Sequence, residues 1–163
     1  MEELEILKHQ LIKEEHTKVE TLKLVSFKIG EEEFAIDILL VQEIIKLMDI
    51  TRVPRSPGYV EGVINLRGRV IPVINIRKRL TLPPREFDKD TKIVVIDLAK
   101  KTLGFIVDSV SEVIEIEKST IEPPPSVMGE VDSQFISGVG KLADRLLVLM
   151  DLEKVLSRDY QSV

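Results

Sequence analysis

Between Thr21 and Leu156 the chain consists of short apolar runs, rich in valine and isoleucine, that turn-forming residues separate. Leu22–Ile29 alternates apolar and polar positions, and Gly30-Glu31 follows it as a turn. Alternation with a period of two indicates a half-buried strand, and helical periodicity is nearly absent from this part of the chain. Regularly spaced short strands of this kind predict an all-β sandwich or small β-barrels.

Further strands are predicted between three loops that contain proline. Val41–Leu47 is either a strand or a short helix that leads into one, and a C-terminal helix begins within Leu152–Leu156. The loops are Val53–Tyr59, Arg77–Asp90 and Pro123–Gln134. The strands are expected at Glu32–Ile38, Val60–Leu66, Arg69–Ile76, Thr91–Leu98, Thr102–Val110, Ser111–Ile121, Phe135–Leu142 and Arg145–Leu152.

The stretch VEGVINLRGRVIPVINIR, residues 60–77, predicts a β-hairpin whose charged tip is Arg67-Gly68. Its second strand is apolar at both alternating sets of positions, one set being Ile71 and Val73 and the other Val70, Ile74 and Ile76. Both faces of this strand should therefore be covered, as in a strand that lies between two cores.

The first 20 residues differ from the rest of the chain. Leu4, Leu7 and Leu11 follow helical spacing, and charged residues fill most other positions. Residues 1–20 are therefore expected to form an N-terminal extension that is helical or disordered, with docking against a partner or a second copy as the alternative.

The body contains an internal repeat. Shifted by 76 positions, Val60–Leu80 overlays Ile136–Leu156; shifted by 69, the stretch that begins at Leu22 overlays the stretch that begins at Thr91. The change of offset falls in the loop Pro123–Gln134, where insertions cost little. We therefore expect two copies of a roughly five-stranded unit that share an interface, with residues 21–88 and 89–157 as subdomains and 158–163 as a tail. Arg67 has no counterpart in the second copy, which has Ala143 there.

Composition excludes several functional classes. The net charge of −5 and the 4% of aromatic residues give no support to nucleic-acid binding. The absence of cysteine excludes disulfides, thiolate zinc sites and cysteine nucleophiles. No apolar run approaches the roughly 20 residues that span a bilayer, and the acidic N-terminus lacks the apolar region of a signal peptide, so the expected location is the cytoplasm.

Residues suited to catalysis are not found together. Both histidines, His9 and His16, lie in the N-terminal extension, and no phosphate-binding or metalloprotease motif is present. The aspartates at strand ends are expected to be turn-forming or solvated; they are Asp37, Asp97, Asp108, Asp132 and Asp151. The sequence therefore predicts a protein that is not an enzyme, needs no cofactor or metal, and acts by binding other proteins.

Four stretches carry a resemblance to a known family: FAIDILLVQEI, VPRSPGYVEGVINLRGRVIPVINIR, GFIVDSVSEV and ISGVGKLADRLLVLMDLEKVL. They resemble the CheW family of bacterial chemotaxis coupling proteins, over about residues 21–156. The resemblance implies a mainly β fold of two packed SH3-like five-stranded barrels, with a short C-terminal helix after the N-terminal helical extension. It also implies a non-catalytic adaptor that binds the cytoplasmic tip of methyl-accepting chemoreceptors and the regulatory domain of the histidine kinase CheA, and so is recruited to receptor arrays at the inner membrane.

The resemblance also suggests which residues make these contacts. Carried over position by position, the receptor-binding residues are Val41, Glu43, Asn65 and Arg67. The stretch LMDITRVP is similar to the kinase-contacting region of the family, which gives Met48, Ile50 and Val53 as kinase-binding residues. Apart from the resemblance, two other functions remain open: a small-ligand sensor or enzyme built on the same barrels, and a structural oligomer assembled through edge strands.

Overall fold

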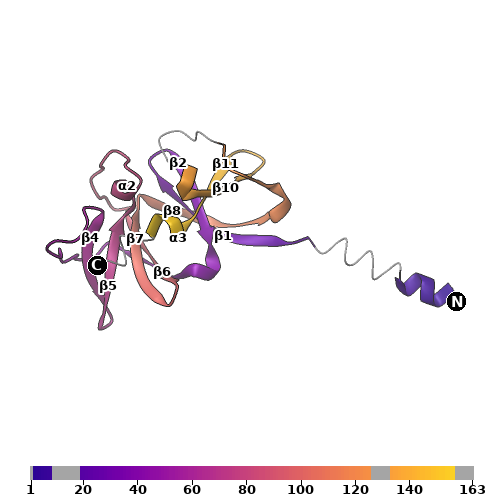
Figure 1. Cartoon of the computed structure of the whole chain (residues 1–163), viewed down its shortest axis with the longest axis horizontal. Helices are drawn as coiled ribbons and strands as arrows, with labels where there is room; N and C mark the ends of the chain where they lie inside the picture. The colour runs from indigo at the N-terminus through magenta and orange to yellow at the C-terminus, as the bar shows by residue number, and fades with distance from the viewer. Residues whose placement is uncertain (1, 9–18, 126–132, 157–163) are drawn as a thin grey trace.

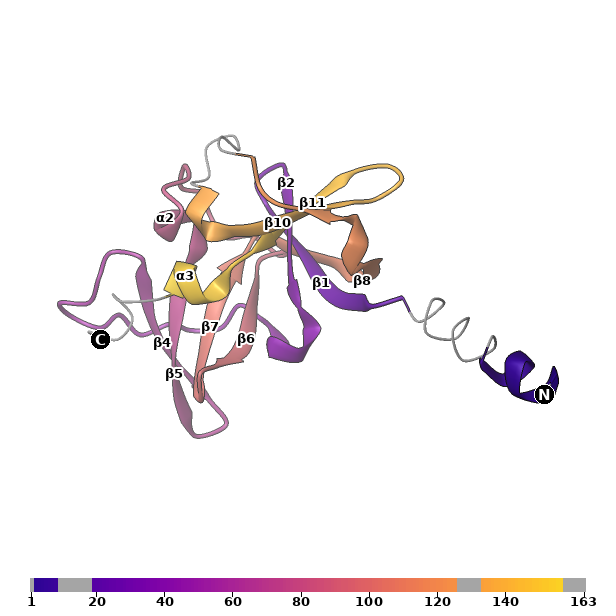
Figure 2. The ribbon, with the colours of Figure 1, turned by 45° about the vertical axis from the view of Figure 1, so that its right-hand side comes forward.

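The computed structural model describes residues 2–8, 19–125 and 133–156. Residues 2–8 form a helix that stands away from the body, and Figure 1 shows it at the far right. Residues 1 and 9–18 of the N-terminal extension and the predicted tail at 158–163 lie outside the described residues. The body is built from two antiparallel-rich sheets, which form the two barrels (Figure 2).

The first sheet, called barrel A here, has six strands, and the second, barrel B, has five. In spatial order, barrel A contains β8 (Ser109–Glu117), β1 (Thr21–Ile29), β2 (Glu32–Asp37), β11 (Leu146–Met150), β10 (Ile136–Lys141) and β9 (Ile121–Glu122). In spatial order from one edge of the sheet to the other, barrel B contains β3 (Val41–Lys46), β6 (Lys92–Leu98), β7 (Lys101–Val107), β5 (Arg69–Asn75) and β4 (Val60–Leu66). The short helices are η1 (Ile38–Leu40), α2 (Ile76–Arg79), η2 (Lys118–Thr120), η3 (Ser133–Phe135) and α3 (Leu152–Leu156).

Each sheet curls until its ends meet. The chain that follows β3 reaches β4 through a bridge between Thr51 and Val63, with both N–H···O distances at 2.8 Å. In barrel A the chain that follows β8 forms β9, which pairs with β10. The mainly β fold with two barrels and a C-terminal helix is therefore confirmed, and Val41–Leu47 forms a strand rather than a helix over most of its length.

The repeat is present in the structure, because the offsets of 69 and 76 superimpose the strand order of one barrel on that of the other. β3, β6, β7, β5 and β4 take the places of β8, β1, β2, β11 and β10. Irregularities in the ladders also correspond: the register shifts between Val60 and Gly62 in barrel B and between Ile136 and Gly138 in barrel A. The short helices α2 and α3 follow equivalent strands.

The barrels do not, however, follow the halves 21–88 and 89–157. β1 and β2 belong to barrel A, whose other strands come from the second half, whereas β6 and β7 belong to barrel B with three strands of the first half. Each exchanged hairpin pairs in parallel with a strand of the other half: β7 pairs with β5 in barrel B, and β2 pairs with β11 in barrel A. The two units are thus interleaved along the chain, and each barrel is completed by a hairpin from the other half.

Three apolar clusters result from this arrangement. One fills barrel B and includes Ile71 and Val73, and another fills barrel A. The largest lies between the barrels and includes Ile74, Ile76 and Phe105. Strand β5 therefore faces two cores, as its sequence predicts, except at Val70, which is 70% exposed because it lies beside the hairpin tip.

Candidate functional site

The predicted hairpin tip is a two-residue turn between β4 and β5. Arg67 has φ of 51° and Gly68 has φ of 84°, so both central residues are left-handed, as in the type I′ turns that suit the twist of a hairpin. The side chain of Asn65 stabilises the turn, because its Oδ1 accepts a hydrogen bond from the Gly68 amide at 2.9 Å. Arg67 is thereby held at the apex of a tightly defined turn.

Arg67 is not free at this apex. Its Nη2 donates to Glu43 Oε2, and the two side chains are 69% and 27% exposed. Glu43 lies on β3, which is separated from β4 by the whole width of the open sheet, so this ion pair also crosses the mouth of the closed barrel. Val41 lies two residues earlier, half-buried against the core between the barrels. The structure therefore gathers the predicted receptor-binding residues at one end of barrel B.

A second polar chain lies beside the first. Arg69 donates to the Thr102 hydroxyl at 2.7 Å, and that hydroxyl donates to Asp97 at 2.7 Å. Gln42 donates to the other oxygen of Asp97 at 3.2 Å. Because β5 and β7 are parallel, the tip of the β4–β5 hairpin and the tip of the β6–β7 hairpin lie at the same end of the barrel. These links join both tips to β3.

The predicted kinase-binding residues lie elsewhere. Met48 and Ile50 are half-buried against the core of barrel B, and Val53 is half-buried in the loop that leads to β4. Within the described part of the chain, no hydrogen bond or ion pair joins these residues to Arg67 or Glu43. Met48 and Ile50 contribute to the interior as well as to the surface, so Val53 is the position where a binding role is best separated from packing.

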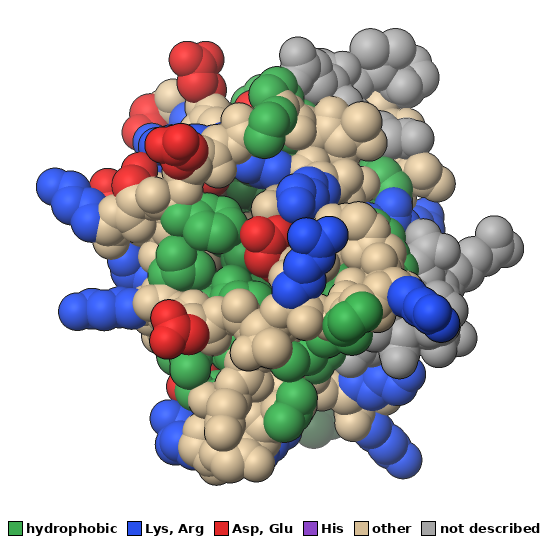
Figure 3. Space-filling model, turned by 90° about the vertical axis from the view of Figure 1, so that its left-hand side faces the viewer, with side chains coloured by type: hydrophobic (Ala, Val, Ile, Leu, Met, Phe, Trp, Pro, Cys, Tyr) green, Lys and Arg blue, Asp and Glu red, His purple; other side chains and the backbone are tan. Residues whose placement is uncertain are grey.

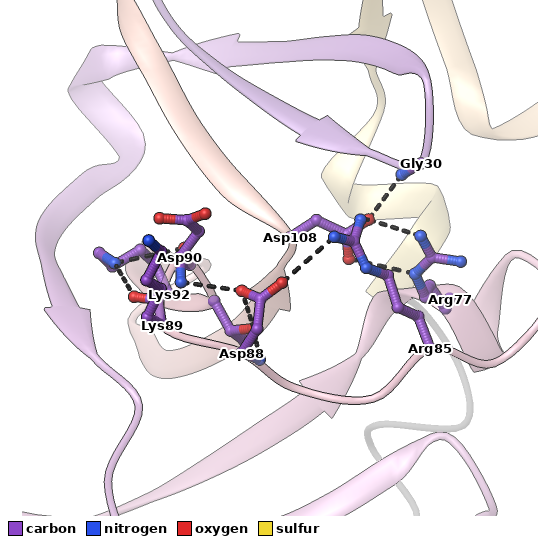
Figure 4. Close-up of polar contacts among 9 residues, drawn as sticks. Gly30, Arg77, Arg85, Asp88, Lys89, Asp90, Lys92 and Asp108 are labelled. Carbon is purple, nitrogen blue, oxygen red and sulfur yellow. Dashed lines mark hydrogen bonds and ion pairs between the residues drawn. The ribbon is translucent and has the colours of Figure 1, made fainter.

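The sequence did not identify a polar cluster at the place where the chain passes from barrel B back to barrel A (Figure 4). Arg77 of α2 binds both oxygens of Asp108, with Nε to Oδ1 at 3.1 Å and Nη2 to Oδ2 at 2.5 Å. The Gly30 amide and Arg85 Nη1 also donate to Asp108 Oδ2, at 2.6 Å and 3.1 Å. The side chains of Arg77 and Asp108 are 14% and 13% exposed. Asp108 is expected from the sequence to be turn-forming or solvated, and no pattern in the sequence indicates that Arg77 faces it.

The surroundings of these carboxylates shift their pKa values. Burial alone would raise the pKa of Asp108, but hydrogen bonds from Arg77 and the Gly30 amide, together with the charges of Arg77 and Arg85, hold it below its ordinary value. Asp88, which pairs with Arg85 Nη2 at 3.2 Å, also belongs to the cluster, and its pKa is lowered, chiefly by a hydrogen bond from the Asp90 amide. Both residues are thus ionised at neutral pH, and the cluster joins the β1–β2 turn, α2 and the start of β8.

The end of barrel A that corresponds to the Arg67 end of barrel B also carries an arginine paired with carboxylates. Arg145, the counterpart of Arg69, donates to Glu33 at 2.6 Å and also pairs with Glu112, the counterpart of Glu43. The hydrogen bond to Glu33 raises the pKa of Arg145; burial opposes this shift, and the hydrogen bond to Glu112 adds to it, so this arginine stays charged. The repeat in the sequence signals this equivalence, since Arg69 and Arg145 align. The end of barrel A lacks an apex arginine, because Ala143 lies there.

The described residues hold no group of three or more His, Cys, Asp or Glu side chains placed to bind a metal ion. In the same ranges, no helix is both long and apolar enough to cross a membrane. What the end of barrel B offers is a rigid guanidinium, a carboxylate and exposed apolar side chains, which is a recognition surface rather than a reaction centre.

Comparison with known proteins now decides the family. The model of the CheW-like domain matches residues 23–159 of the chain. The chain belongs to the CheW-like domain family. Chemotaxis protein CheW of Helicobacter pylori is 38% identical over 141 residues, which cover 86% of this chain and 85% of that protein. Chemotaxis protein CheW of Bacillus subtilis is 38% identical over 137 residues, covering 84% of this chain and 88% of that protein.

A solved structure agrees with this assignment. The crystal structure of the scaffolding protein TtCheW from Thermoanaerobacter tengcongensis has a TM-score of 0.79 and 37% sequence identity, and covers 88% of this chain and 92% of that one. Members of the CheW family are non-catalytic scaffolds, in agreement with the absence of a catalytic motif in the sequence.

Proposed function

We propose that this CheW-family chain is a non-catalytic adaptor that couples methyl-accepting chemoreceptors to the histidine kinase CheA, and that its receptor-binding surface is the end of barrel B. The observation that carries the proposal is the ion pair between Arg67 and Glu43, which brings together two residues assigned to receptor binding from separate parts of the sequence. Half-buried Val41 and the Asn65-capped turn complete this surface.

The chemistry of the surface fits a helical receptor tip. A planar guanidinium pairs with a carboxylate or with main-chain carbonyls at two points, and arginine is enriched among residues that dominate binding energy. Because Arg67 already pairs with Glu43, a receptor helix that supplies its own carboxylate exchanges one ion pair for another. Apolar contacts, with Val41 and exposed Val70 nearby, then supply the net gain.

The kinase surface is proposed on the other side of barrel B, around Met48, Ile50 and Val53. Half-buried apolar side chains beside a projecting loop suit a protein–protein contact of moderate size. Through both contacts the chain would be recruited to receptor arrays at the inner membrane, while its own charge of −5 gives it no affinity for anionic lipid.

Calorimetric titration with a receptor cytoplasmic fragment, and separately with the CheA regulatory domain, tests the adaptor. We expect binding to both, and we expect Arg67→Ala to weaken receptor binding at least about tenfold while leaving kinase binding unchanged. Lys118→Ala is the matched control, since it also removes an exposed ion pair, with Glu20, but lies on barrel A. Binding to neither partner would overturn the adaptor function.

Val53→Glu tests the kinase surface. The substitution places a charge on a half-buried loop residue without opening a cavity in the barrel, so the fold should remain. Kinase binding should fall while receptor binding stays as in the wild type. Unchanged kinase affinity would remove Val53 from the contact.

A further inference from the structure

Barrel B has a hollow that borders the proposed kinase surface at Val53 but whose charged residues belong to neither proposed binding surface. The loop at 52–58 leaves the barrel after the Thr51–Val63 bridge, projects from the body beside β4 (Figure 2), and returns at Val60, whose amide donates to Pro57 at 2.9 Å. Between this loop, Glu61 of β4 and Lys78 of α2 lies a cavity of about 210 Å³. At roughly 30 Å³ per water, the cavity has room for a small ion and a few waters, and it is smaller than the pockets that enclose whole cofactors.

The lining of this cavity is strongly positive. Arg52, Arg55 and Lys78 contribute three positive charges and Glu61 one negative charge, so the hollow carries +2 in a chain whose net charge is −5. Glu61 is already engaged, by Lys78 Nζ at 3.4 Å and by Asn75 Nδ2 at 3.2 Å. The carboxylate of Glu61 therefore already has two partners, Lys78 and Asn75, before Arg52 or Arg55 is taken into account.

The two arginines of the loop differ from all other arginines that the structure describes. Each of the others has a hydrogen-bond, ion-pair or ring partner, whereas within the described ranges Arg52 and Arg55 have none. Both line the same cavity. Six arginines thus find partners elsewhere on this acidic chain, and the two that do not are neighbours on one loop.

The loop holds them in place. Arg55 has φ of 63°, a left-handed conformation that an arginine seldom adopts, and it follows Pro54, whose ring fixes its own φ. Ser56 Oγ donates to the Val53 carbonyl at 2.8 Å and closes the turn. A turn of this kind would favour glycine or asparagine, so its local conformation does not explain the arginine. Ordering by proline and by this hydrogen bond lowers the entropy that a ligand would otherwise have to remove.

We propose that the hollow bounded by Arg52, Arg55 and Lys78 is a binding site for a phosphomonoester group. A phosphomonoester carries about −1.5 to −2 at neutral pH and presents three strong acceptor oxygens, which matches a +2 site with two guanidinium forks and one ammonium. A carboxylate has a single charge and two oxygens, and so matches less well. Figure 3, which faces the side of the molecule where the loop lies, shows lysine and arginine side chains at the left, right and lower rim of this face and acidic side chains at its upper left.

The group can come from two sources, a free phosphate compound or a phosphorylated side chain of another protein. The charged residues of the site lie outside the receptor surface, and its test needs neither receptor nor kinase. The full ¹⁵N-labelled chain is titrated at pH 7.5 with inorganic phosphate, with N-acetyl-phosphoserine, and with sodium acetate as the carboxylate control, all at constant ionic strength.

We expect saturable amide shifts confined to residues 52–58, 61 and 78, with both phosphate probes binding at least about tenfold tighter than acetate. Arg52→Gln and Arg55→Gln should each weaken phosphate binding about tenfold, because each removes a charge-assisted contact. Lys89→Gln, an exposed loop cation outside the cavity, is the matched control and should leave the affinity unchanged. Glu61→Gln should tighten binding roughly threefold, since it removes the one competing carboxylate.

Tighter binding of N-acetyl-phosphoserine than of inorganic phosphate would identify a phosphorylated side chain as the source, and the reverse a free phosphate compound. Shifts that are scattered over the surface without saturation would overturn the site. The same conclusion would follow if Glu61→Gln weakened binding, because a positively charged hollow must respond in the opposite sense. Melting temperatures of all variants within a degree or two of the wild type would show that the exposed substitutions had not disturbed the fold.

Discussion

At the scale of single residues, Arg67 occupies a position that the backbone alone would assign to another residue. Two-residue hairpin turns with both φ values positive favour Asn-Gly, and a long L side chain there is less favourable. The sequence placed Arg67 at the tip and in a functional role, but its pairing with Glu43 depends on the closure of the barrel, which no local pattern reveals.

Arg67→Asn should therefore separate function from stability. Because asparagine tolerates φ of 51° better than arginine does, the variant should melt at the same temperature as the wild type or slightly above it. Receptor binding should nevertheless be lost. Differential scanning calorimetry, together with the receptor titration, checks both parts; a clearly lowered melting temperature would make Arg67 a structural residue.

Gly68→Val should have the opposite profile. No heavy atom lies within 4 Å of the position of an added Cβ, so only the backbone opposes the change. A β-branched residue held at φ of 84° should cost about 1–2 kcal/mol, which corresponds to a fall of roughly 2–8 °C in melting temperature. Gly58→Val is the control, because Gly58 also has open space around its Cβ position but no positive φ. Equal stability of the two variants would contradict the strain argument.

At the scale of elements, the cluster around Asp108 connects parts of the chain that belong to different barrels. Its pairing with Arg77 could not be anticipated, because both residues lie beside strand ends, where solvated charges are the usual outcome. Position in the sequence gives the polarity of such residues but not their burial, which depends on how the barrels pack. The cluster is therefore the part of the fold that sequence patterns describe least well.

Asp108→Ala should lower the free energy of unfolding by about 2–4 kcal/mol, because it leaves the guanidinium of Arg77 in a mostly buried place without its carboxylate. Urea unfolding followed by circular dichroism measures the loss. Asp88→Ala, which removes a more exposed partner of Arg85 from the same cluster, should have a much smaller effect. Similar losses for both variants would show that burial is not what gives Asp108 its importance.

The same carboxylate predicts a dependence of stability on pH. Since the pKa of Asp108 is lowered in the folded state, its contribution is complete above the ordinary value of 3.8 and disappears as the pH falls through the folded value. Below about pH 4 the wild type should therefore lose stability more steeply than Asp108→Asn. Parallel curves for the two proteins would mean that the lowered pKa has no thermodynamic consequence.

At the scale of the whole molecule, the repeat predicted which strands are equivalent and the order in which they occur. It could not predict that the halves exchange hairpins, because a strand presents the same apolar face and the same hydrogen-bonding groups to either copy of its neighbour. β6 and β7 pair well with β3 and β5 across the predicted boundary at residue 88. The direct connection from β2 through η1 to β3 carries the chain from barrel A to barrel B, and the 69-residue offset does not show which sheet each strand joins.

The exchange makes a prediction about fragments of the chain. Residues 19–88 and residues 89–156, produced separately, should each remain unfolded, because each barrel would lack a central hairpin. Mixed in equal amounts, they should recover the strand-rich circular dichroism spectrum and the dispersed amide spectrum of the intact chain. A cooperative thermal transition in either fragment alone would show that the halves are independent folding units.

The interleaving also determines which barrel can be completed first as the growing polypeptide leaves the ribosome. Barrel B can close once β7 has emerged at Val107, whereas the β1–β2 hairpin, made first, must wait for β8 and then for β11 at Leu146–Met150. During that interval Phe27 and Phe34, which stack on each other and are fully buried in the finished molecule, lack the apolar neighbours that β11 and α3 supply. Chains are generally made at about 5–20 residues per second, so the hairpin waits several seconds for these strands, and this early segment is where the nascent chain exposes apolar surface and unpaired strand edges for longest.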